Sequence, residues 1–223
     1  RSSHLKPVPK GGGIIFSLVS SFLFYFQGFK LPLICLPLSF IGLIDDKYNL
    51  SNIFRYLIQI LTVIVIILNS QLIENYYLGN NLFEILLIIA LVFISSAIIN
   101  FINFTDGING LVTGCIICFL IPVSIISSGV YLILIGSLLS FLIWNWDPAR
   151  IFMGDAGSTY LGSILVIVLT SESTFQKSFN LALIMTPLFA DAFTCIIRRY
   201  FKGQNIFKPH KLHLYQRLYQ AGL

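Results

Sequence analysis

The stretch LFEILLIIALVFISSAIINFINFTDGINGL, residues 82–111, joins a long apolar run to a short polar loop. The apolar part, Leu82–Ile102, is long enough to cross a bilayer, which takes roughly 20 residues. The loop that follows collects asparagine, aspartate and glycine. Because apolar runs of this kind recur along the chain and end in polar loops, the sequence predicts an all-helical membrane protein.

Composition supports this prediction. The chain is 57% hydrophobic and 10% charged with a mean hydropathy of +0.88, whereas a soluble domain carries roughly 25% charged residues. We expect a polytopic integral membrane helical bundle with about eight spans. They are Ile14–Phe29, Leu31–Ile44, Ile53–Leu68, Leu82–Ile102, Leu111–Ile126, Val130–Trp146, Thr159–Thr170 and Phe179–Ile197. The second, which contains Pro32 and Pro37, and the seventh are short, so we expect them to be tilted, broken or re-entrant.

The polar segment at residue 1 begins with Arg rather than Met. We therefore expect at least one further helix before it, and a single membrane domain over residues 1–223 that is truncated at one or both ends.

Alternating spans place most of the charged loops on one side of the membrane. Of the 14 Lys and Arg residues, all but Lys30 and Lys177 fall on that side, together with all three histidines and most of the loop aspartates. Positive residues mark the cytoplasmic side. The later loops stay on the same side of the membrane if Ile14–Ile44 is one re-entrant hairpin instead of two spans. We therefore predict a functional site on the cytoplasmic face.

This distribution separates functional classes. Channels and ion-coupled transporters keep their ionisable groups near the bilayer midplane, whereas here only two of the nine acidic residues, Glu84 and Asp191, lie inside apolar runs. An enzyme is therefore the first interpretation. A multi-pass transporter with cytoplasmic-side carboxylates is the alternative, and a structural membrane protein comes third.

The stretch GLIDDKYNLS, residues 42–51, contains two adjacent aspartates, Asp45 and Asp46. Two close carboxylates stay ionised only if a cation or a donor compensates their charge. A hard divalent metal would do so. The other interpretation is a charged helix cap at the membrane boundary, with Lys47 and Arg55 as its ion-pair partners.

The stretch IFMGDAGSTYLG, residues 151–162, surrounds Asp155 with small residues where an apolar helix begins. Free N–H groups at a helix start favour phosphate, and a carboxylate there can hold Mg²⁺ against it. Asp155 as a simple N-cap is the alternative. The loop of Asn103, Asp106 and Asn109 can hydrogen-bond a nucleobase or ribose, but D-G and N-G are also ordinary turn formers.

The stretch PHKLHLYQRL, residues 209–218, places His210, His213 and Arg217 on one face if it is helical. This face is rich in donors, which suits phosphate oxygens. Zinc is a weaker interpretation, because two histidines without a third soft ligand nearby fall short of a tetrahedral set.

Five motifs in this order resemble the polyprenyl-phosphate N-acetylhexosamine-1-phosphate transferases of glycosyltransferase family 4, relatives of phospho-N-acetylmuramoyl-pentapeptide transferase. They span nearly the whole chain: PVPKGG at 7–12, DDKYNLS at 45–51, NFTDGINGL at 103–111, FMGDAGS at 152–158 and HKLHLYQR at 210–217. The resemblance implies a bundle of about ten spans, so we expect one or more further helices outside this chain.

The resemblance also implies the reaction: transfer of a sugar 1-phosphate from a UDP-N-acetylhexosamine to a polyprenyl (undecaprenyl) phosphate in the bacterial cytoplasmic membrane, with release of UMP. By this analogy Asp155 is the ligand of Mg²⁺, for which Mn²⁺ can substitute. Asp45 receives or orients the proton of the lipid phosphate, and Asp46 assists.

The remaining implied contacts are with the substrates. The resemblance assigns Asn103, Asp106 and Asn109 to the nucleotide, and His210, His213 and Arg217 to the diphosphate and sugar. Further candidates for phosphate binding are Lys10, Arg55 and Gly154. The expected partners are the two substrates and the lipid bilayer; a homodimer is allowed, and no nucleic acid is expected.

One departure from the family pattern concerns the last motif. The pentapeptide transferases carry consecutive histidines there, whereas this chain has the spaced HKLHLYQR. This is more similar to enzymes that start O-antigen, the outer part of lipopolysaccharide, or other surface polysaccharides. The donor stays open between UDP-GlcNAc and 6-deoxy sugars such as UDP-FucNAc or UDP-QuiNAc.

Overall fold

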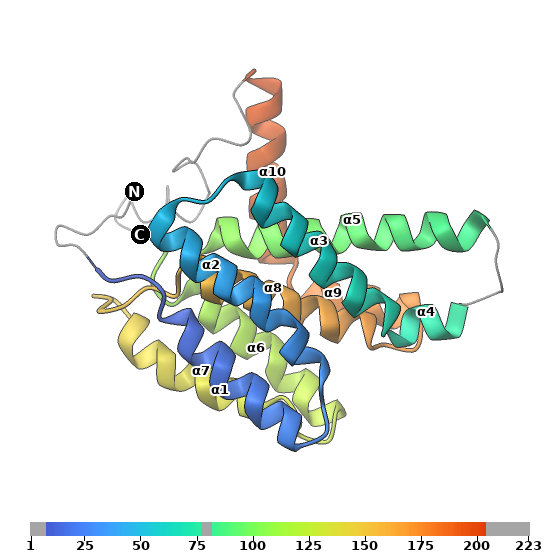
Figure 1. Cartoon of the computed structure of the whole chain (residues 1–223), viewed down its shortest axis with the longest axis horizontal. Coiled ribbons are helices and arrows are strands. Elements are labelled where there is room, and N and C mark those ends of the chain that lie inside the picture. Colours follow the sequence, from blue (N-terminus) through green and yellow to red (C-terminus); the bar gives the residue numbers. More distant parts are fainter. Residues whose placement is uncertain (1–7, 77–81, 204–223) are drawn as a thin grey trace.

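The computed structural model describes residues 8–76 and 82–203 (Figure 1). Within these ranges the regular elements are helices and no strand occurs, which confirms the all-helical prediction. In chain order they are α1 (Gly13–Phe26), the 3₁₀ turn η1 (Leu31–Cys35), α2 (Leu36–Tyr48), α3 (Asn52–Leu68), α4 (Gln71–Tyr76), α5 (Leu82–Thr105), α6 (Leu111–Ile126), α7 (Leu132–Asn145), α8 (Gly154–Thr170), α9 (Phe175–Ile184) and α10 (Thr186–Phe201).

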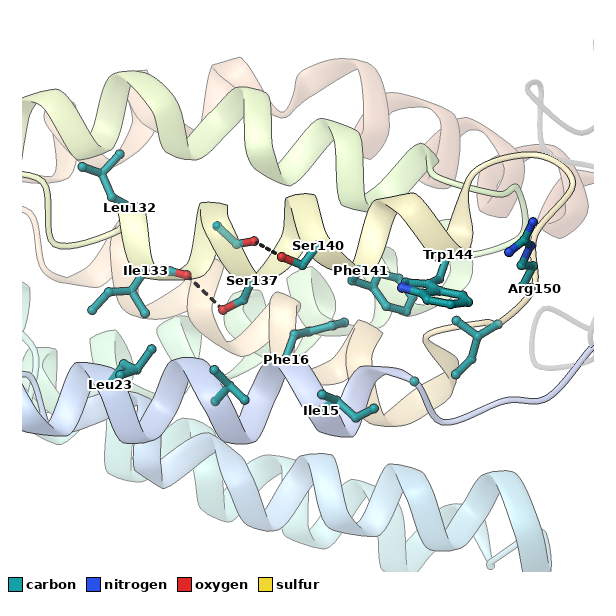
Figure 2. Close-up of a pocket in the computed structure, with 14 residues that line it drawn as sticks. Ile15, Phe16, Leu23, Leu132, Ile133, Ser137, Ser140, Phe141, Trp144 and Arg150 are labelled. Atoms are coloured by element: carbon teal, nitrogen blue, oxygen red, sulfur yellow. Dashed lines mark hydrogen bonds between the residues drawn. The ribbon is translucent and has the colours of Figure 1, made fainter.

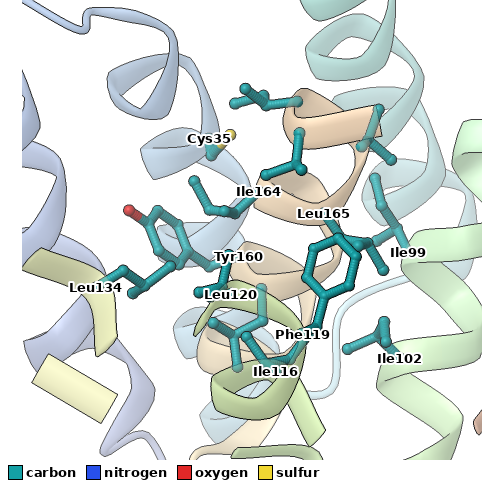
Figure 3. Close-up of a cluster of buried hydrophobic side chains, with 14 of the residues drawn as sticks. Cys35, Ile99, Ile102, Ile116, Phe119, Leu120, Leu134, Tyr160, Ile164 and Leu165 are labelled. Carbon is teal, nitrogen blue, oxygen red and sulfur yellow. The ribbon is translucent and has the colours of Figure 1, made fainter. Parts of the chain in front are cut away.

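Helix α8 occupies the centre of the bundle, with α1, α2 and α5 packed around it. Every residue from Ala156 to Thr170 is buried. Figure 3 shows Ile164 and Leu165 of α8 among apolar side chains from several neighbouring elements, such as Ile99 of α5 and Phe119 of α6. Because α8 is buried on all sides, it provides the axis around which the other helices pack.

Buried hydroxyl groups join α8 to the helices beside it. The phenol oxygen of Tyr160 lies 2.9 Å from Ser20 Oγ and 2.8 Å from Ser21 Oγ. Ser39 of α2 donates to the Ala156 carbonyl at 2.9 Å, and its Oγ lies 2.9 Å from Ser17 Oγ of α1. Because buried polar groups need partners, these pairs fix how α1 and α2 rotate against the first turns of α8.

The two short apolar runs have different explanations. Leu31–Ile44 is broken, because the 3₁₀ turn Leu31–Cys35 precedes α2. The 3₁₀ turn and α2 each have a proline as their second residue. Thr159–Thr170 is the apolar part of the 17-residue α8, which begins earlier at Gly154. The break in the first run agrees with the sequence prediction.

The run Phe179–Ile197 was predicted as one continuous span, and the structure divides it between two helices, α9 and α10, that meet at 82°. The break lies at Met185, directly before Thr186 and Pro187. Proline is tolerated in the first turn of a helix but not in its interior, so Pro187 starts a new helix instead of continuing α9. Figure 1 shows α10 pointing away from the other helices.

Among the described residues, one helix is long and apolar enough to cross a membrane alone. It is α5, with 24 residues and a mean hydropathy of 2.8 over its best window. The bent pair α9 and α10 would make a second if counted as one span, and the other apolar helices have 10–17 residues. The count of eight spans therefore stays a prediction.

Candidate active site

The C-terminal end of α2 fixes the first aspartate. Asn49 adopts a left-handed conformation with φ of 50° and ends the helix, and its N–H donates to the Asp45 carbonyl at 2.9 Å. The next N–H, that of Leu50, donates to Asp45 Oδ1 at 2.7 Å. The carboxylate of Asp45 is therefore oriented by the turn that follows its own helix.

The second aspartate, Asp46, caps a different helix. Helix α8 has no side-chain cap of its own, and the N–H of Asp155 in its first turn donates to Asp46 Oδ2 at 2.9 Å. The first N–H groups of a helix lack partners and favour negative charge. Asp46 supplies both a partner and a charge from α2, across 109 positions of sequence.

Glycines allow this close approach. A Cβ at Gly154, which has φ of +68°, would collide with Asp46 Oδ2. A Cβ at Gly42 of α2 would lie 2.6 Å from the Ala156 nitrogen, and one at Gly13 of α1 would collide with Gly157 of α8. The main chains of α1 and α2 therefore touch the start of α8 directly.

Arg55 of a third helix joins two of the carboxylates in the site, those of Asp45 and Asp155. The cap Ser51 starts α3, and Arg55 lies in the first turn. Its Nη1 lies 2.6 Å from Asp45 Oδ2, and its Nη2 lies 2.6 Å from Asp155 Oδ2. One guanidinium thus bridges the end of α2 and the start of α8.

Backbone pairing brings Lys10 to the same place. Phe152 N–H donates to the Pro9 carbonyl at 2.9 Å, and Gly12 N–H donates to the Phe152 carbonyl at 2.9 Å. Lys10 lies inside this pairing, and its Nζ is 3.8 Å from Asp46 Oδ1. Its side chain is 53% exposed, so the ammonium group can reach a ligand at the surface.

The carboxyl groups affect one another. Burial, and after it the carboxylates of Asp155 and Asp46, raise the pKa of Asp106 to about 7. Burial and then the Asp155 carboxylate raise the pKa of Asp46 to about 6. Burial raises the pKa of Asp45 although Arg55 opposes it. A cation placed here would stabilise the ionised forms, so the cluster favours positive charge.

The amide residues divide between two places. Asn103, near the end of α5, donates through Nδ2 to Ser158 Oγ in α8 at 2.9 Å, beside the carboxylates. Asn109 donates to Asp147 Oδ1 at 2.7 Å. Asn145 connects the loops that contain Asn109 and Asp147, since its side chain accepts from Gly110 N–H and donates to the Ile151 carbonyl, both at 2.9 Å.

Most of the predicted site residues in the described part of the chain therefore converge, drawn from four helices and two loops. The members that lie together are Lys10, Asp45, Asp46, Arg55, Asp106, Gly154 and Asp155, with Asn103 beside them. Asn109 binds the loop of Asp147. The predictions for His210, His213 and Arg217 lie outside the described residues.

Three supporting residues were missed by the sequence prediction. Ser39 contacts the Ala156 carbonyl, Ser158 accepts from Asn103, and Asn145 spans two loops. Only Asn145 carried a signal, because an amide directly before Trp146 at the end of an apolar run has to find partners. Buried serines in apolar helices are common, and their sequence neighbours do not identify their contacts.

The donor set suits a hard cation held jointly with a ligand. Among residues 8–76 and 82–203, no group of three or more His, Cys, Asp or Glu side chains is arranged to hold a metal ion by itself. Mg²⁺ is usually held by one or two carboxylates together with substrate phosphates. Asp45 and Asp155, both of which contact the same guanidinium, offer oxygen atoms of that kind.

An apolar groove of about 750 Å³ runs along α1 and α7 (Figure 2). Its walls include Phe16, Leu23 and Ile133, and Trp144 and Arg150 lie at one end, where the guanidinium of Arg150 is 5.7 Å from the ring of Trp144. Gly12 lines this groove next to the backbone pairing that holds Lys10. No carboxylate lines it, so the acidic cluster remains the candidate for chemistry.

Comparisons with known proteins agree with the family resemblance. The model of the family "Glycosyl transferase family 4" matches residues 29–172. A Bacillus subtilis protein named "Probable undecaprenyl-phosphate N-acetylglucosaminyl 1-phosphate transferase" is 36% identical over 205 residues, which cover 82% of this chain and 56% of the relative.

Two further relatives match nearly the whole chain. A decaprenyl-phosphate N-acetylglucosaminephosphotransferase of Mycobacterium leprae is 27% identical over 100% of this chain and 69% of its own length. An undecaprenyl-phosphate alpha-N-acetylglucosaminyl 1-phosphate transferase of Thermotoga maritima is 27% identical over 96% and 68%. The chain thus spans between about half and two thirds of the length of these relatives.

Proposed function

The chain belongs to glycosyl transferase family 4, and on this premise we propose that it transfers an N-acetylhexosamine 1-phosphate from a UDP-sugar to a polyprenyl phosphate and releases UMP. The names of the relatives support a polyprenyl phosphate acceptor and an N-acetylglucosamine 1-phosphate group. UDP-GlcNAc is therefore the first donor to test.

The observation that carries the proposal is the bridge formed by Arg55. It holds Asp45 and Asp155 at 2.6 Å each, while Lys10 and Asp46 complete the cluster. Phosphoryl transfer depends mainly on alignment and on neutralising charge at the transferring group. Two cationic side chains beside several carboxylates, at the start of a helix, provide the elements that this chemistry uses.

In the proposed reaction an oxygen of the lipid phosphate attacks the β-phosphorus of the UDP-sugar. The bond from that phosphorus to the bridging oxygen breaks, and the bridging oxygen leaves with UMP. Asp45 faces Arg55 and orients the lipid phosphate or takes its proton. Asp46, which caps α8 and lies near Lys10, acts by positioning Asp155.

Mg²⁺ would be held by Asp155 together with the diphosphate, and when bound it would neutralise charge on the transferring phosphate. The loop of Asp106 and Asn109 would contact the nucleotide. Lys10, and the donors of His210, His213 and Arg217, would contact phosphate oxygens or the sugar.

The proposed location is the cytoplasmic face of a bacterial membrane, where the reaction would begin a cell-surface polysaccharide such as O-antigen. Asn49, which ends α2 next to the carboxylates, is a suitable position for testing on which side of the membrane the site lies. A cysteine placed there should react with a membrane-impermeant thiol reagent only after the inner face is opened. Labelling of intact cells would contradict this location.

The activity is tested with the full-length protein, undecaprenyl phosphate and a panel of labelled UDP-sugars. We expect a labelled lipid diphosphate-sugar and an equal amount of UMP with at least one N-acetylhexosamine donor. Formation of UDP instead of UMP would indicate transfer of the sugar alone, and no lipid product with any donor would remove the proposal.

A further inference from the structure

Arg55 contacts one oxygen atom of each of the two carboxylates that could hold a divalent cation. Its two terminal nitrogens each lie 2.6 Å from a different carboxylate, Asp45 of α2 and Asp155 of α8. The Asp45 side chain is 11% exposed and that of Asp155 is 28% exposed, so water screens these contacts only partly.

The chemistry of arginine makes this arrangement persistent. A guanidinium cannot be deprotonated in a protein, and its fork places two donors at fixed spacing against two acceptors. The other described cation of the cluster, Lys10, is 3.8 Å from Asp46 and 53% exposed. Arg55 is therefore the cation that most closely compensates Asp45 and Asp155.

We propose that Arg55 is a built-in counterion that competes with the divalent cation for Asp155 and Asp45. The protein therefore binds a free divalent cation weakly and accepts it together with an anionic diphosphate. A divalent cation that arrives alone adds positive charge beside the guanidinium and is repelled by it. The negative charge of a diphosphate that arrives with the cation offsets this repulsion. When the cation binds Asp155, the Nη2 group of Arg55 loses its carboxylate partner. A phosphate oxygen of the diphosphate can then accept from it, since guanidinium and phosphate groups pair well. The inference rests on the proposed function for the identity of the diphosphate.

The test measures Mn²⁺ binding by the electron paramagnetic resonance signal of the free ion, with and without UDP. In the full-length wild-type protein we expect weak binding without UDP and tighter binding with it. Arg55→Gln removes the competing charge and keeps a polar side chain, so it should bind Mn²⁺ alone at least tenfold more tightly. The gain caused by UDP should then shrink.

Three further variants make the result specific. Arg55→Lys should lie between wild type and Arg55→Gln, because one ammonium group can neutralise only one of the two carboxylates closely. Arg198→Gln, which removes the same charge from an exposed arginine of α10, should leave Mn²⁺ binding unchanged. Adding Asp155→Asn to Arg55→Gln should abolish the tight binding.

The proposal fails if Arg55→Gln and Arg55→Lys bind Mn²⁺ no more tightly than the wild type. If the Gln variant does not fold, as judged by melting in EDTA, the Lys variant alone decides. These measurements need no turnover. If the variants bind Mn²⁺ more tightly but the wild type has no transferase activity, the counterion role of Arg55 stands and the proposed function fails. If the wild type is active but the variants bind Mn²⁺ no more tightly, the proposed function stands and the counterion role fails.

Discussion

The two ends of α8 are held by different kinds of contact. In the first turn the Asp155 carboxylate pairs with Arg55 at 2.6 Å, and the Asp155 N–H donates to Asp46. A few directional contacts therefore set the position of this end. From Ile164 onward α8 is surrounded by apolar side chains (Figure 3). Charged contacts depend strongly on distance and geometry, whereas apolar packing is a sum of many small terms. We therefore expect substitutions at the first end to change the chemistry, and substitutions at the second to change mainly stability.

The largest expected effect on transfer comes from Asp155→Asn. The amide keeps the shape but loses the charge that faces Arg55 and would hold Mg²⁺, which is worth several kcal/mol at a transferring phosphate. We expect a loss of about a thousandfold or more in rate, with normal membrane insertion, measured by lipid-product formation over a magnesium titration.

The matched control lies beyond the opposite end of the same helix. Glu172→Gln removes one carboxylate charge just after Thr170 and should leave the rate nearly unchanged. Near-normal transfer by Asp155→Asn at any magnesium concentration would remove Asp155 from the site, and with it the contrast between the two ends.

The next effect comes from Gly42→Ala. The added Cβ would lie 2.6 Å from main-chain atoms of Asp155 and Ala156, which cannot turn aside as a flexible side chain can. Separating α2 from α8 would move Asp46 from the Asp155 N–H. A misplacement of about 1 Å can cost about a hundredfold in rate, and overpacking costs about 1–3 kcal/mol in stability. Transfer rate and thermal melting measure the two effects.

The control for this substitution is Gly114→Ala in α6, where an added Cβ meets nothing within 4 Å. This variant should keep the wild-type rate. If Gly42→Ala also kept it, the close contact of α2 with α8 would matter for packing alone.

A smaller effect is expected from the histidines at 210 and 213, which lie outside the described residues. If they donate to the diphosphate, His→Ala should lose about one to two powers of ten in rate, because a charge-assisted hydrogen bond is worth roughly 1.5–3 kcal/mol. His→Gln keeps one donor and should lose less. Both losses should persist at saturating Mg²⁺ and resist added zinc. Wild-type transfer by the double alanine variant would count against the phosphate role.

The smallest effect on chemistry should come from Leu165→Ala, in the apolar half of α8. Leu165 is 1% exposed, and removing a buried leucine side chain costs about 2–5 kcal/mol in stability. The variant should melt at a lower temperature, while the folded fraction keeps the wild-type KM and kcat. A changed KM for the UDP-sugar would show that the apolar end also positions the site.

The sequence indicated which acidic residues lie together better than it indicated their contacts. Carboxylates are costly in so apolar a chain, so Asp45, Asp46 and Asp155 could be chosen from sequence. Their contacts could not, because Asp46 caps a helix that starts 109 positions away. In the apolar run Phe179–Ile197, Pro187 is a sequence signal for a break, but the angle of 82° between α9 and α10 has no local sequence pattern that would predict it.

The complete burial of α8 has a consequence for biosynthesis. Its three principal neighbours, α1, α2 and α5, all precede it in the chain, and proteins are made from the N-terminus. These helices leave the ribosome while the space between them has no central helix. Asp46 is thus made long before Asp155, whose N–H it accepts in the folded protein. In a nascent chain that stops short of Gly154, Arg55 has one carboxylate partner, Asp45, instead of two. The arrival of α8 is the step at which the bundle closes and the acidic cluster gains its last member.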